Sequence, residues 1–234
     1  MIRRFAPLAL SLAVLLASAA QAAEKPRYNS YPRGAKPRDA APAPAPQPLP
    51  DLVRVAMVTE LGTIELELDH KRAPLTTENF MAYVALKRFD GIVFYRSMHL
   101  AWGEQPTGLV QAGLQNHPQK IMKPIAHEPT SQTGLSHTPG TISMARYAPG
   151  TATADFSIML NGMTGLDADP KSANPDLQAG FAAFGKVTAS MDVVRAIWDA
   201  PRSPTKGEGV MKGQMLDPTI KVLTVRRIAD PVVP

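Results

Sequence analysis

The sequence predicts a mainly β domain, a closed antiparallel β-barrel, over residues 51–229. Short segments in which apolar and polar residues alternate follow one another through this region, separated by residues that favour turns. Only two segments have the periodicity of an amphipathic helix. Closure into a barrel removes the exposed edges that an open sheet of so many strands would leave. The region has about the size of one domain with its own core.

The first half of this region begins with two alternating segments around a turn that contains Gly62, which predicts a β-hairpin with one buried face. A helix then begins at Pro74, because proline is tolerated in the first helical turn, and it ends near residues 89–91. Its apolar residues Phe80 and Val84 are four apart and share one face. The strands predicted in this half are 53–58, 64–68, 92–95 and 109–111.

The second half contains one more helix, for which Ser190 is the expected N-cap. Met191, Val194 and Ile197 fall on one side of this helix, and Pro201 ends it. The strands predicted in this half are 140–145, 156–160, 180–187 and 220–225.

The N-terminal 50 residues have a different composition from the rest of the chain. Residues 1–22 combine Arg3 and Arg4, an apolar run and an Ala-Gln-Ala cleavage box, which predicts a secretory signal peptide. An uncleaved membrane anchor is the alternative. Residues 23–50 are rich in Pro and Ala and predict an extended, disordered linker. We therefore expect a periplasmic or otherwise exported protein with a short tail at 230–234.

Composition excludes several kinds of site. The chain has no cysteine, so it offers neither disulfides nor thiolate metal ligands. Its five histidines do not have the spacing of metal ligands, and we expect no metal. The formal net charge of +5 includes two arginines of the signal peptide and is otherwise dispersed, which argues against nucleic acid as a partner.

Arg96 and Gln111 are the clearest polar pair in an apolar neighbourhood, residues 94–113. Together they offer a fixed cation and a hydrogen-bonding amide, but no acid, base or nucleophile. That combination suits electrostatic stabilisation of a strained substrate better than bond cleavage. Ordinary roles, as a salt-bridged strand arginine and a surface glutamine, are the alternative.

The order of segments across residues 51–229 resembles the cyclophilin family of peptidyl-prolyl isomerases. The matching pieces are Ala73-Pro74 with Thr77-Glu78-Asn79-Phe80, Phe94-Tyr95-Arg96, Val110-Gln111-Ala112-Gly113, Pro139-Gly140, Ser143-Met144-Ala145-Arg146, Ala154-Asp155-Phe156 and Phe184-Gly185-Lys186-Val187.

The resemblance implies an eight-stranded antiparallel barrel capped by two helices. It also implies that Arg96 is the catalytic arginine and that Gln111 holds substrate and arginine in register. No cofactor, metal or covalent intermediate is required for this reaction. The residues implied in substrate binding are Phe94, Tyr95, Leu109, Met144, Ala145, Phe156, Leu166 and Phe181.

The chain departs from the family pattern at positions that matter for substrate binding. Gly108 stands where a large aromatic is expected, and Trp102 is either its replacement or an exposed loop residue. Ser157 replaces the phenylalanine of the pocket floor, and Gly165 stands where an aromatic often lies. Two insertions, 97–108 and 167–179, have no assigned contacts. We therefore expect an altered, less active isomerase that binds cyclosporin-type ligands poorly.

The predicted function is isomerisation of X-Pro bonds in exported proteins, by a monomer whose partners are proline-containing, unfolded or extended polypeptides. One alternative is a weakly active or inactive module that binds such segments as an envelope chaperone or scaffold. Another alternative is a barrel that encloses a small hydrophobic ligand.

Overall fold

The computed structural model describes residues 49–229. The predicted signal peptide, all but the end of the predicted linker and the C-terminal tail lie outside the described residues. Within the described part, no helix is both long and apolar enough to cross a membrane.

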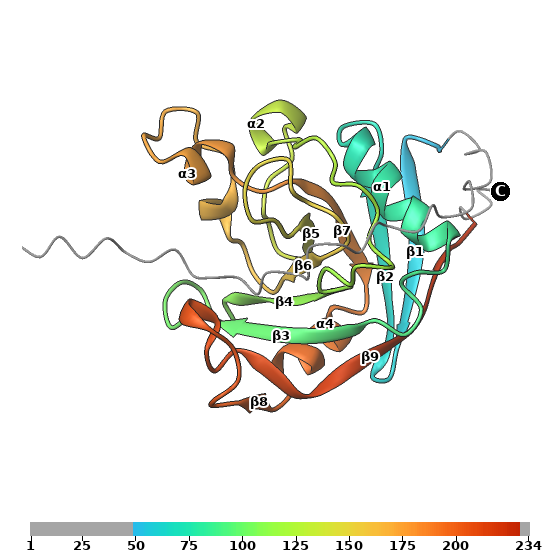
Figure 1. The fold of residues 1–234 in the computed structure, drawn as a ribbon, viewed down its shortest axis with the longest axis vertical. Coiled ribbons are helices and arrows are strands. Elements are labelled where there is room, and N and C mark those ends of the chain that lie inside the picture. The colour runs from blue at the N-terminus through green and yellow to red at the C-terminus, as the bar shows by residue number, and fades with distance from the viewer. Residues whose placement is uncertain (1–48, 230–234) are drawn as a thin grey trace, which may run out of the picture. The chain divides into compact units, whose positions relative to one another are not determined.

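The described chain forms a closed antiparallel barrel, as predicted (Figure 1). Its nine-stranded sheet has the order β1-β2-β7-β5-β6-β4-β3-β9-β8, and β1 also pairs with β9. Eight strands therefore close the barrel, and the two-residue β8 extends it beside β9. The strands are β1 (Leu52–Thr59), β2 (Gly62–Asp69), β3 (Val93–His99), β4 (Gly108–Gly113), β5 (Thr141–Met144), β6 (Phe156–Met159), β7 (Ala183–Ala189), β8 (Arg202–Ser203) and β9 (Met215–Arg227).

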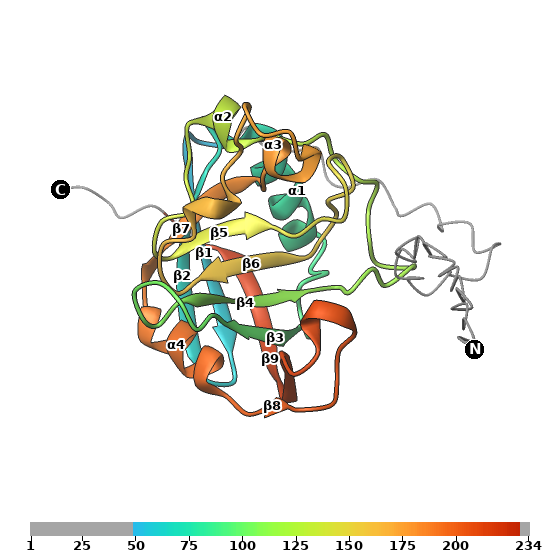
Figure 2. The ribbon, with the colours of Figure 1, turned by 90° about the vertical axis from the view of Figure 1, so that its left-hand side faces the viewer.

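The two predicted helices are the longest ones, α1 (Pro74–Ala85) and α4 (Met191–Asp199), and they lie at opposite ends of the barrel (Figure 2). Ser190 holds the N-cap position of α4, but the predicted capping bond is absent. Its backbone is left-handed, with φ of 68°, and its side chain makes no cap hydrogen bond. The shorter helical segments are α2 (Thr130–Thr133), α3 (Pro175–Ala179), η1 (Thr164–Leu166) and η2 (Gly209–Met211).

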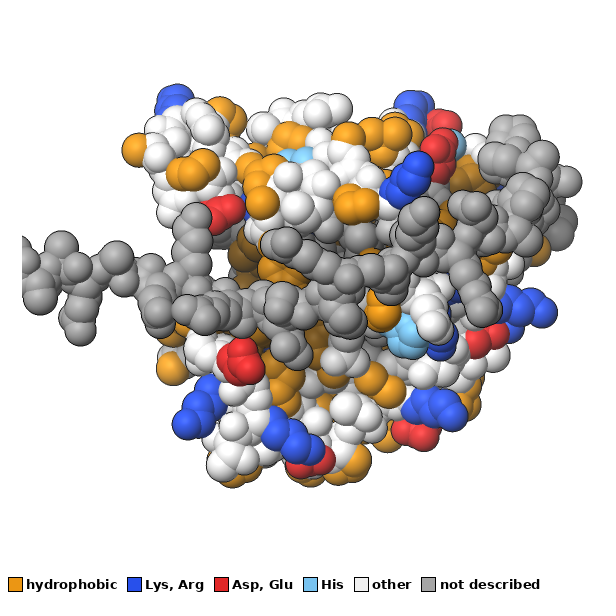
Figure 3. Space-filling model, in the orientation of Figure 1, with side chains coloured by type: hydrophobic (Ala, Val, Ile, Leu, Met, Phe, Trp, Pro, Cys, Tyr) orange, Lys and Arg blue, Asp and Glu red, His pale blue; other side chains and the backbone are white. Residues whose placement is uncertain are grey.

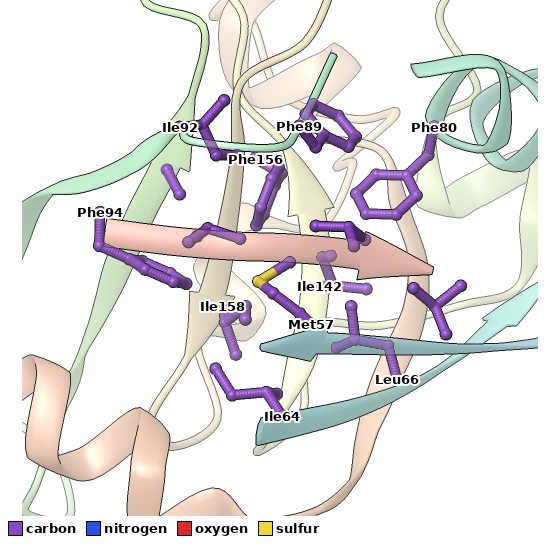
Figure 4. Close-up of a cluster of buried hydrophobic side chains, with 14 of the residues drawn as sticks. Met57, Ile64, Leu66, Phe80, Phe89, Ile92, Phe94, Ile142, Phe156 and Ile158 are labelled. Carbon is purple, nitrogen blue, oxygen red and sulfur yellow. The ribbon is translucent and has the colours of Figure 1, made fainter. Parts of the chain in front are cut away.

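Alternation along the strands builds the core. In β1 and β2 every second residue is fully buried, which fixes the register because a slip of one residue would turn the apolar set outward. Aromatic rings meet at the centre: Phe80 lies 4.8 Å from Phe89 and 5.5 Å from Phe156 between ring centroids (Figure 4). These aromatic contacts join α1 to the inner face of β6.

Glu128 fastens the start of α1 to the long loop that follows β4. The buried carboxylate accepts hydrogen bonds from Leu75 N at 3.1 Å and from Thr76 N at 2.8 Å. It also accepts from the Thr76 hydroxyl at 2.6 Å. The first backbone N–H groups of a helix have no partner within the helix, and an anion at this end is favoured. Glu128 therefore caps the N-terminus of α1, although it lies 52 residues from Thr76 in the sequence.

Replacing Glu128 by alanine is expected to lower the free energy of unfolding by about 2–3 kcal/mol, because three donors lose a charged acceptor at a buried position. Urea denaturation measures this loss. Glu78→Ala, which removes an exposed carboxylate from the same helix, should change stability by less than about 0.5 kcal/mol. Equal effects of the two substitutions would contradict the capping role.

Candidate active site

Four polar side chains form a row across neighbouring strands on the outside of the barrel. Arg96 on β3 is paired with Gln111 on β4, Gln111 with Ser157 on β6, and Ser157 with Ser143 on β5. Directly paired residues in antiparallel strands point to the same face, so these four side chains share one face of the sheet, on which Ser157 and Ser143 are buried. In Figures 1 and 2 the strands lie one above another, from β3 at the bottom to β5 at the top. We call these four residues the polar row.

The residues beneath the polar row are apolar. Figure 3 shows the same side of the molecule as Figure 1, with charged side chains mainly towards its edges. The side chains that precede Ser157 and Ser143, Phe156 and Ile142, are fully buried in the core beneath. The row is therefore a polar strip on an apolar support.

A β-bulge at Tyr95 aims Arg96 outward. Phe94 pairs with Ala112, whereas Arg96 pairs with Gln111, so β3 has one more residue than β4 between these pairs. Bulges of this kind redirect side chains and are common beside functional sites. The extra residue, Tyr95, donates its hydroxyl to Asp155 Oδ1 at 2.8 Å, which anchors the bulge.

Each of the three nitrogen atoms of the Arg96 guanidinium contacts a side chain. Its Nη1 donates to Gln111 Oε1 at 2.9 Å and its Nε donates to Gln214 Oε1 at 2.8 Å. Its Nη2 lies 3.4 Å from Met98 Sδ. Burial lowers the pKa of Arg96, but an arginine remains charged in proteins. The structure brings Arg96 and Gln111 into contact, and the cation is oriented rather than neutralised, while their catalytic roles stay a prediction.

Gln214 is absent from the sequence prediction, although it contacts the candidate catalytic arginine. It directly precedes β9 and is 118 residues from Arg96 in the chain. Only the pairing of β3 with β9, which places Arg96 opposite Met215, brings the two together. No local sequence pattern marks this glutamine.

The other predicted site residues fall into two groups. Phe94 and Phe156 are fully buried, with ring centroids 6.4 Å apart, so in this structure they support the face from beneath rather than line it. Leu109 and Met144 are also buried. Tyr95, Ala145, Leu166 and Phe181 are partly exposed. Contact of any of these residues with a substrate remains a prediction.

Leu166 and Phe181 lie side by side above β5. Phe181 N donates to Leu166 O at 2.9 Å, and Met144 N donates to Ala182 O at 3.0 Å. The guanidinium of Arg146 lies 4.6 Å from the centre of the Phe181 ring and donates to Gly180 O at 2.6 Å. These contacts place the end of the 167–179 insertion next to β5, so the insertion borders the upper end of the polar row.

The family model described as "Cyclophilin type peptidyl-prolyl cis-trans isomerase/CLD" matches residues 54–225, which is most of the chain. The chain belongs to the cyclophilin family. Membership makes it an enzyme of the peptidyl-prolyl isomerase class.

Peptidyl-prolyl isomerases from other organisms are similar to this chain. A peptidyl-prolyl cis-trans isomerase of Acinetobacter baylyi is 36% identical over 153 residues, which cover 64% of this chain and 73% of that protein. Peptidyl-prolyl cis-trans isomerase cyp18 of Streptomyces antibioticus is 34% identical over 157 residues, or 65% and 87% of the two chains. A crystal structure of a cyclophilin-type isomerase from Cryptosporidium parvum shares the fold, with a TM-score of 0.57 at 17% identity, over 77% of this chain and 99% of that one.

The missing cyclophilin aromatic at Gly108 has a steric explanation. Gly108 pairs with His99 in the extended β3–β4 hairpin and has φ of +153°. A Cβ atom there would lie 1.9 Å from Met98 O and 2.9 Å from Trp198 Nε1. Trp102 does not replace the aromatic, since it is 69% exposed. This position therefore cannot carry a side chain in the present hairpin.

Ser157 and Gly165 are smaller than the aromatics that the cyclophilin pattern has at these two positions. Ser157 is buried, with 7% of its surface exposed, and a Cβ built on Gly165 meets no atom within 4 Å. A side chain at position 165 would therefore meet open space, whereas a larger one at the buried position 157 must displace its neighbours. The apolar contact available to a proline ring is smaller than the family pattern predicts.

Ser143, at the end of the polar row, belongs to a chain of three hydrogen-bonding side chains. Ser143 Oγ lies 2.8 Å from His137 Nε2, and His137 Nδ1 lies 2.6 Å from Asp167 Oδ1. Burial lowers the pKa of His137, so we assign the neutral ring, donating from Nδ1 to Asp167 and accepting from the serine. Hydrolases use the same three residue types, but here the histidine is fully buried and the serine is 1% exposed within a strand. The three residues therefore tie the 167–179 insertion to β5.

Asp155, at the Tyr95 bulge, is a buried carboxylate with hydrogen bonds to only one of its two oxygens in the described part of the chain. Its Oδ1 accepts from Tyr95 and from Gln115 N, whereas its Oδ2 is buried and has no hydrogen-bond partner in the described structure. Burial raises the pKa of Asp155, against the lowering effect of these hydrogen bonds. The fold therefore favours the protonated form of this side chain more than water does.

Asp155→Asn is expected to stabilise the protein at neutral and alkaline pH by on the order of 1 kcal/mol, because a buried charge is removed while the acceptor oxygen stays. A carboxyl with a raised pKa contributes full stability below its unfolded-state pKa and loses it as pH rises through its folded-state pKa. The advantage of the variant should therefore shrink as the pH falls towards about 4. Urea unfolding at several pH values measures it. The exposed Asp199→Asn is the control, and an advantage of Asp155→Asn that does not change with pH would contradict this account.

Proposed function

We propose that this cyclophilin isomerises X-Pro bonds of polypeptides by hydrogen bonding from Arg96 to the twisted prolyl nitrogen. The observation that carries this proposal is the orientation of the Arg96 guanidinium by two neutral amides on the outer face of the barrel. The polar row offers an oriented cation and hydrogen-bonding groups, and its serines lack the exposure that a nucleophile needs.

The chemistry needs only such a donor. Rotation about a peptide bond crosses a barrier of about 18–20 kcal/mol, because amide resonance is lost in the twisted state. The prolyl nitrogen then regains its lone pair and becomes a hydrogen-bond acceptor. A hydrogen-bond donor already oriented towards that nitrogen binds the twisted state more tightly than either planar isomer, and such differential binding accelerates the reaction.

The proposed substrates are proline-containing segments of exported proteins. Support comes from the predicted signal peptide, which favours a periplasmic or otherwise exported protein. A second crystal structure of the Cryptosporidium parvum isomerase was determined in the presence of the dipeptide Ala-Pro, again with a TM-score of 0.57 and 17% identity. We expect this chain to take Ala-Pro segments as well.

A binding module with little turnover is the second candidate. It is favoured by Ser157 and Gly165, which reduce the apolar contact available to proline while the cation and the amides remain. Such a protein would act on envelope proteins as a chaperone or scaffold.

The two candidates differ in a single experiment. Cis and trans signals of a series of short X-Pro peptides are followed by NMR exchange with the mature chain at substoichiometric concentration. The proposed function predicts exchange faster than the uncatalysed reaction, which takes tens of seconds or more. Peptide binding without faster exchange would support the binding module, and absence of both would overturn both candidates.

A further inference from the structure

We propose that Gln214 is a positioning residue for the isomerase reaction: its side-chain amide fixes the plane of the Arg96 guanidinium from the side opposite Gln111. This inference rests on the proposed function of Arg96 as the hydrogen-bond donor.

The contact joins two otherwise separate parts of the fold. Gln214 Oε1 accepts from Arg96 Nε at 2.8 Å, while Gln111 Oε1 accepts from Nη1 at 2.9 Å. A guanidinium group is planar, so two acceptors at different nitrogens fix both its position and its orientation. The N–H groups that these acceptors leave unused, on Nη1 and Nη2, are the donors available to a substrate.

Gln214 is itself held in place. Its Nε2 donates to Val210 O at 2.8 Å, its backbone N donates to Met211 O at 3.0 Å, and its backbone O accepts from Ser97 N at 2.9 Å. The first two contacts anchor it to η2, and the third anchors it to β3. A side chain with both ends of its amide engaged loses little further entropy when it holds the arginine.

The chemistry of the two acceptors supports this role. Within residues 49–229 no carboxylate pairs with Arg96; its side-chain partners are two glutamine oxygens and a methionine sulfur. A carboxylate at either place would hold the arginine more strongly, but it would also cancel the charge that the transition state uses. Neutral amides orient the cation and leave its charge available.

Substitutions of Gln214 distinguish a positioning role from a purely structural one. Gln214→Glu keeps an acceptor oxygen for Arg96 and adds a salt bridge, but it removes the Nε2 donor to Val210 O. A residue that only ties η2 to β3 should therefore lose stability towards urea and keep its activity while folded. A positioning residue should lower kcat/KM for an Ala-Pro peptide at least tenfold in the folded variant. Gln214→Met removes the acceptor at similar size and should lower kcat about five- to tenfold with KM nearly unchanged.

Gln132→Glu, an exposed change of the same kind on α2, is the matched control and should leave kcat/KM within twofold of wild type. A second readout does not depend on activity. The Nε–H proton of Arg96 should exchange slowly with solvent in wild type, as seen by NMR, and faster in Gln214→Met.

The outcomes separate the two proposals. An active wild type with both Gln214 variants within twofold of its kcat/KM would overturn the positioning role and leave the proposed function intact. An inactive wild type would overturn the proposed function, and the Nε–H exchange would then decide whether Gln214 orients Arg96. Equal Nε–H exchange in wild type and Gln214→Met would overturn the positioning role in that case.

Discussion

Arg96→Ala is expected to lower kcat/KM for X-Pro isomerisation by about 100- to 1,000-fold, the usual cost of removing one oriented donor to a transition state. Binding of the peptide should change far less, because the planar ground state offers no lone pair on the prolyl nitrogen and forms no such bond. The loss should therefore lie in kcat rather than in KM. NMR exchange below and at saturating peptide concentration measures both constants.

The control for this substitution is Arg202→Ala, which removes an exposed arginine from β8 and should leave both constants within twofold of wild type. Arg96→Ala also leaves the oxygens of Gln111 and Gln214 without their donor, so urea unfolding must accompany the assay. A folded Arg96→Ala variant with activity within threefold of wild type would be inconsistent with catalysis by this residue.

Ser157→Phe is expected to lower the Kd of Ala-Pro peptides by about tenfold or more. A fully buried aromatic side chain contributes about 1.5–3 kcal/mol of apolar contact, and 1.4 kcal/mol corresponds to a factor of ten. Ser157 is 7% exposed, so urea unfolding must accompany the binding assay to show that the larger ring is accommodated. The same variant should acquire binding of cyclosporin, which isothermal titration calorimetry detects.

Ser157→Ala serves as the comparison, because it removes the hydroxyl and adds no apolar contact. It should leave the Kd of the peptide within twofold of wild type. If Ser157→Phe folds normally and binds no tighter than Ser157→Ala, the floor of the site is not at this position and the family alignment around β6 is wrong.

The fold was predictable because its information is local. The alternation in β1 and β2 and the apolar spacing in α1 are each contained in a few neighbouring residues, and closure follows from the need to cover edges. The bounds of β9 were less predictable: the strand begins at Met215, before Pro218, whereas composition indicated a start at 220.

The candidate site was predictable only in part. Arg96 and Gln111 carry a recognisable pattern, and their contact is present. Gln214 and Glu128 act over 118 and 52 residues of sequence, and their role depends on strand pairing and loop path rather than on neighbouring residues. The side-chain directions of Phe94 and Phe156 likewise depend on the bulge and the register, which alternation alone does not reveal.

The measurement that tests the central claim most directly is the isomerase activity of Arg96→Lys. Lysine keeps the positive charge but lacks the planar fork that Gln111 and Gln214 orient, so the claim that an oriented guanidinium drives the reaction predicts a loss. We expect kcat/KM for an Ala-Pro peptide to fall at least tenfold while the peptide Kd stays within threefold of wild type. An Arg96→Lys variant with wild-type kcat/KM would contradict the account.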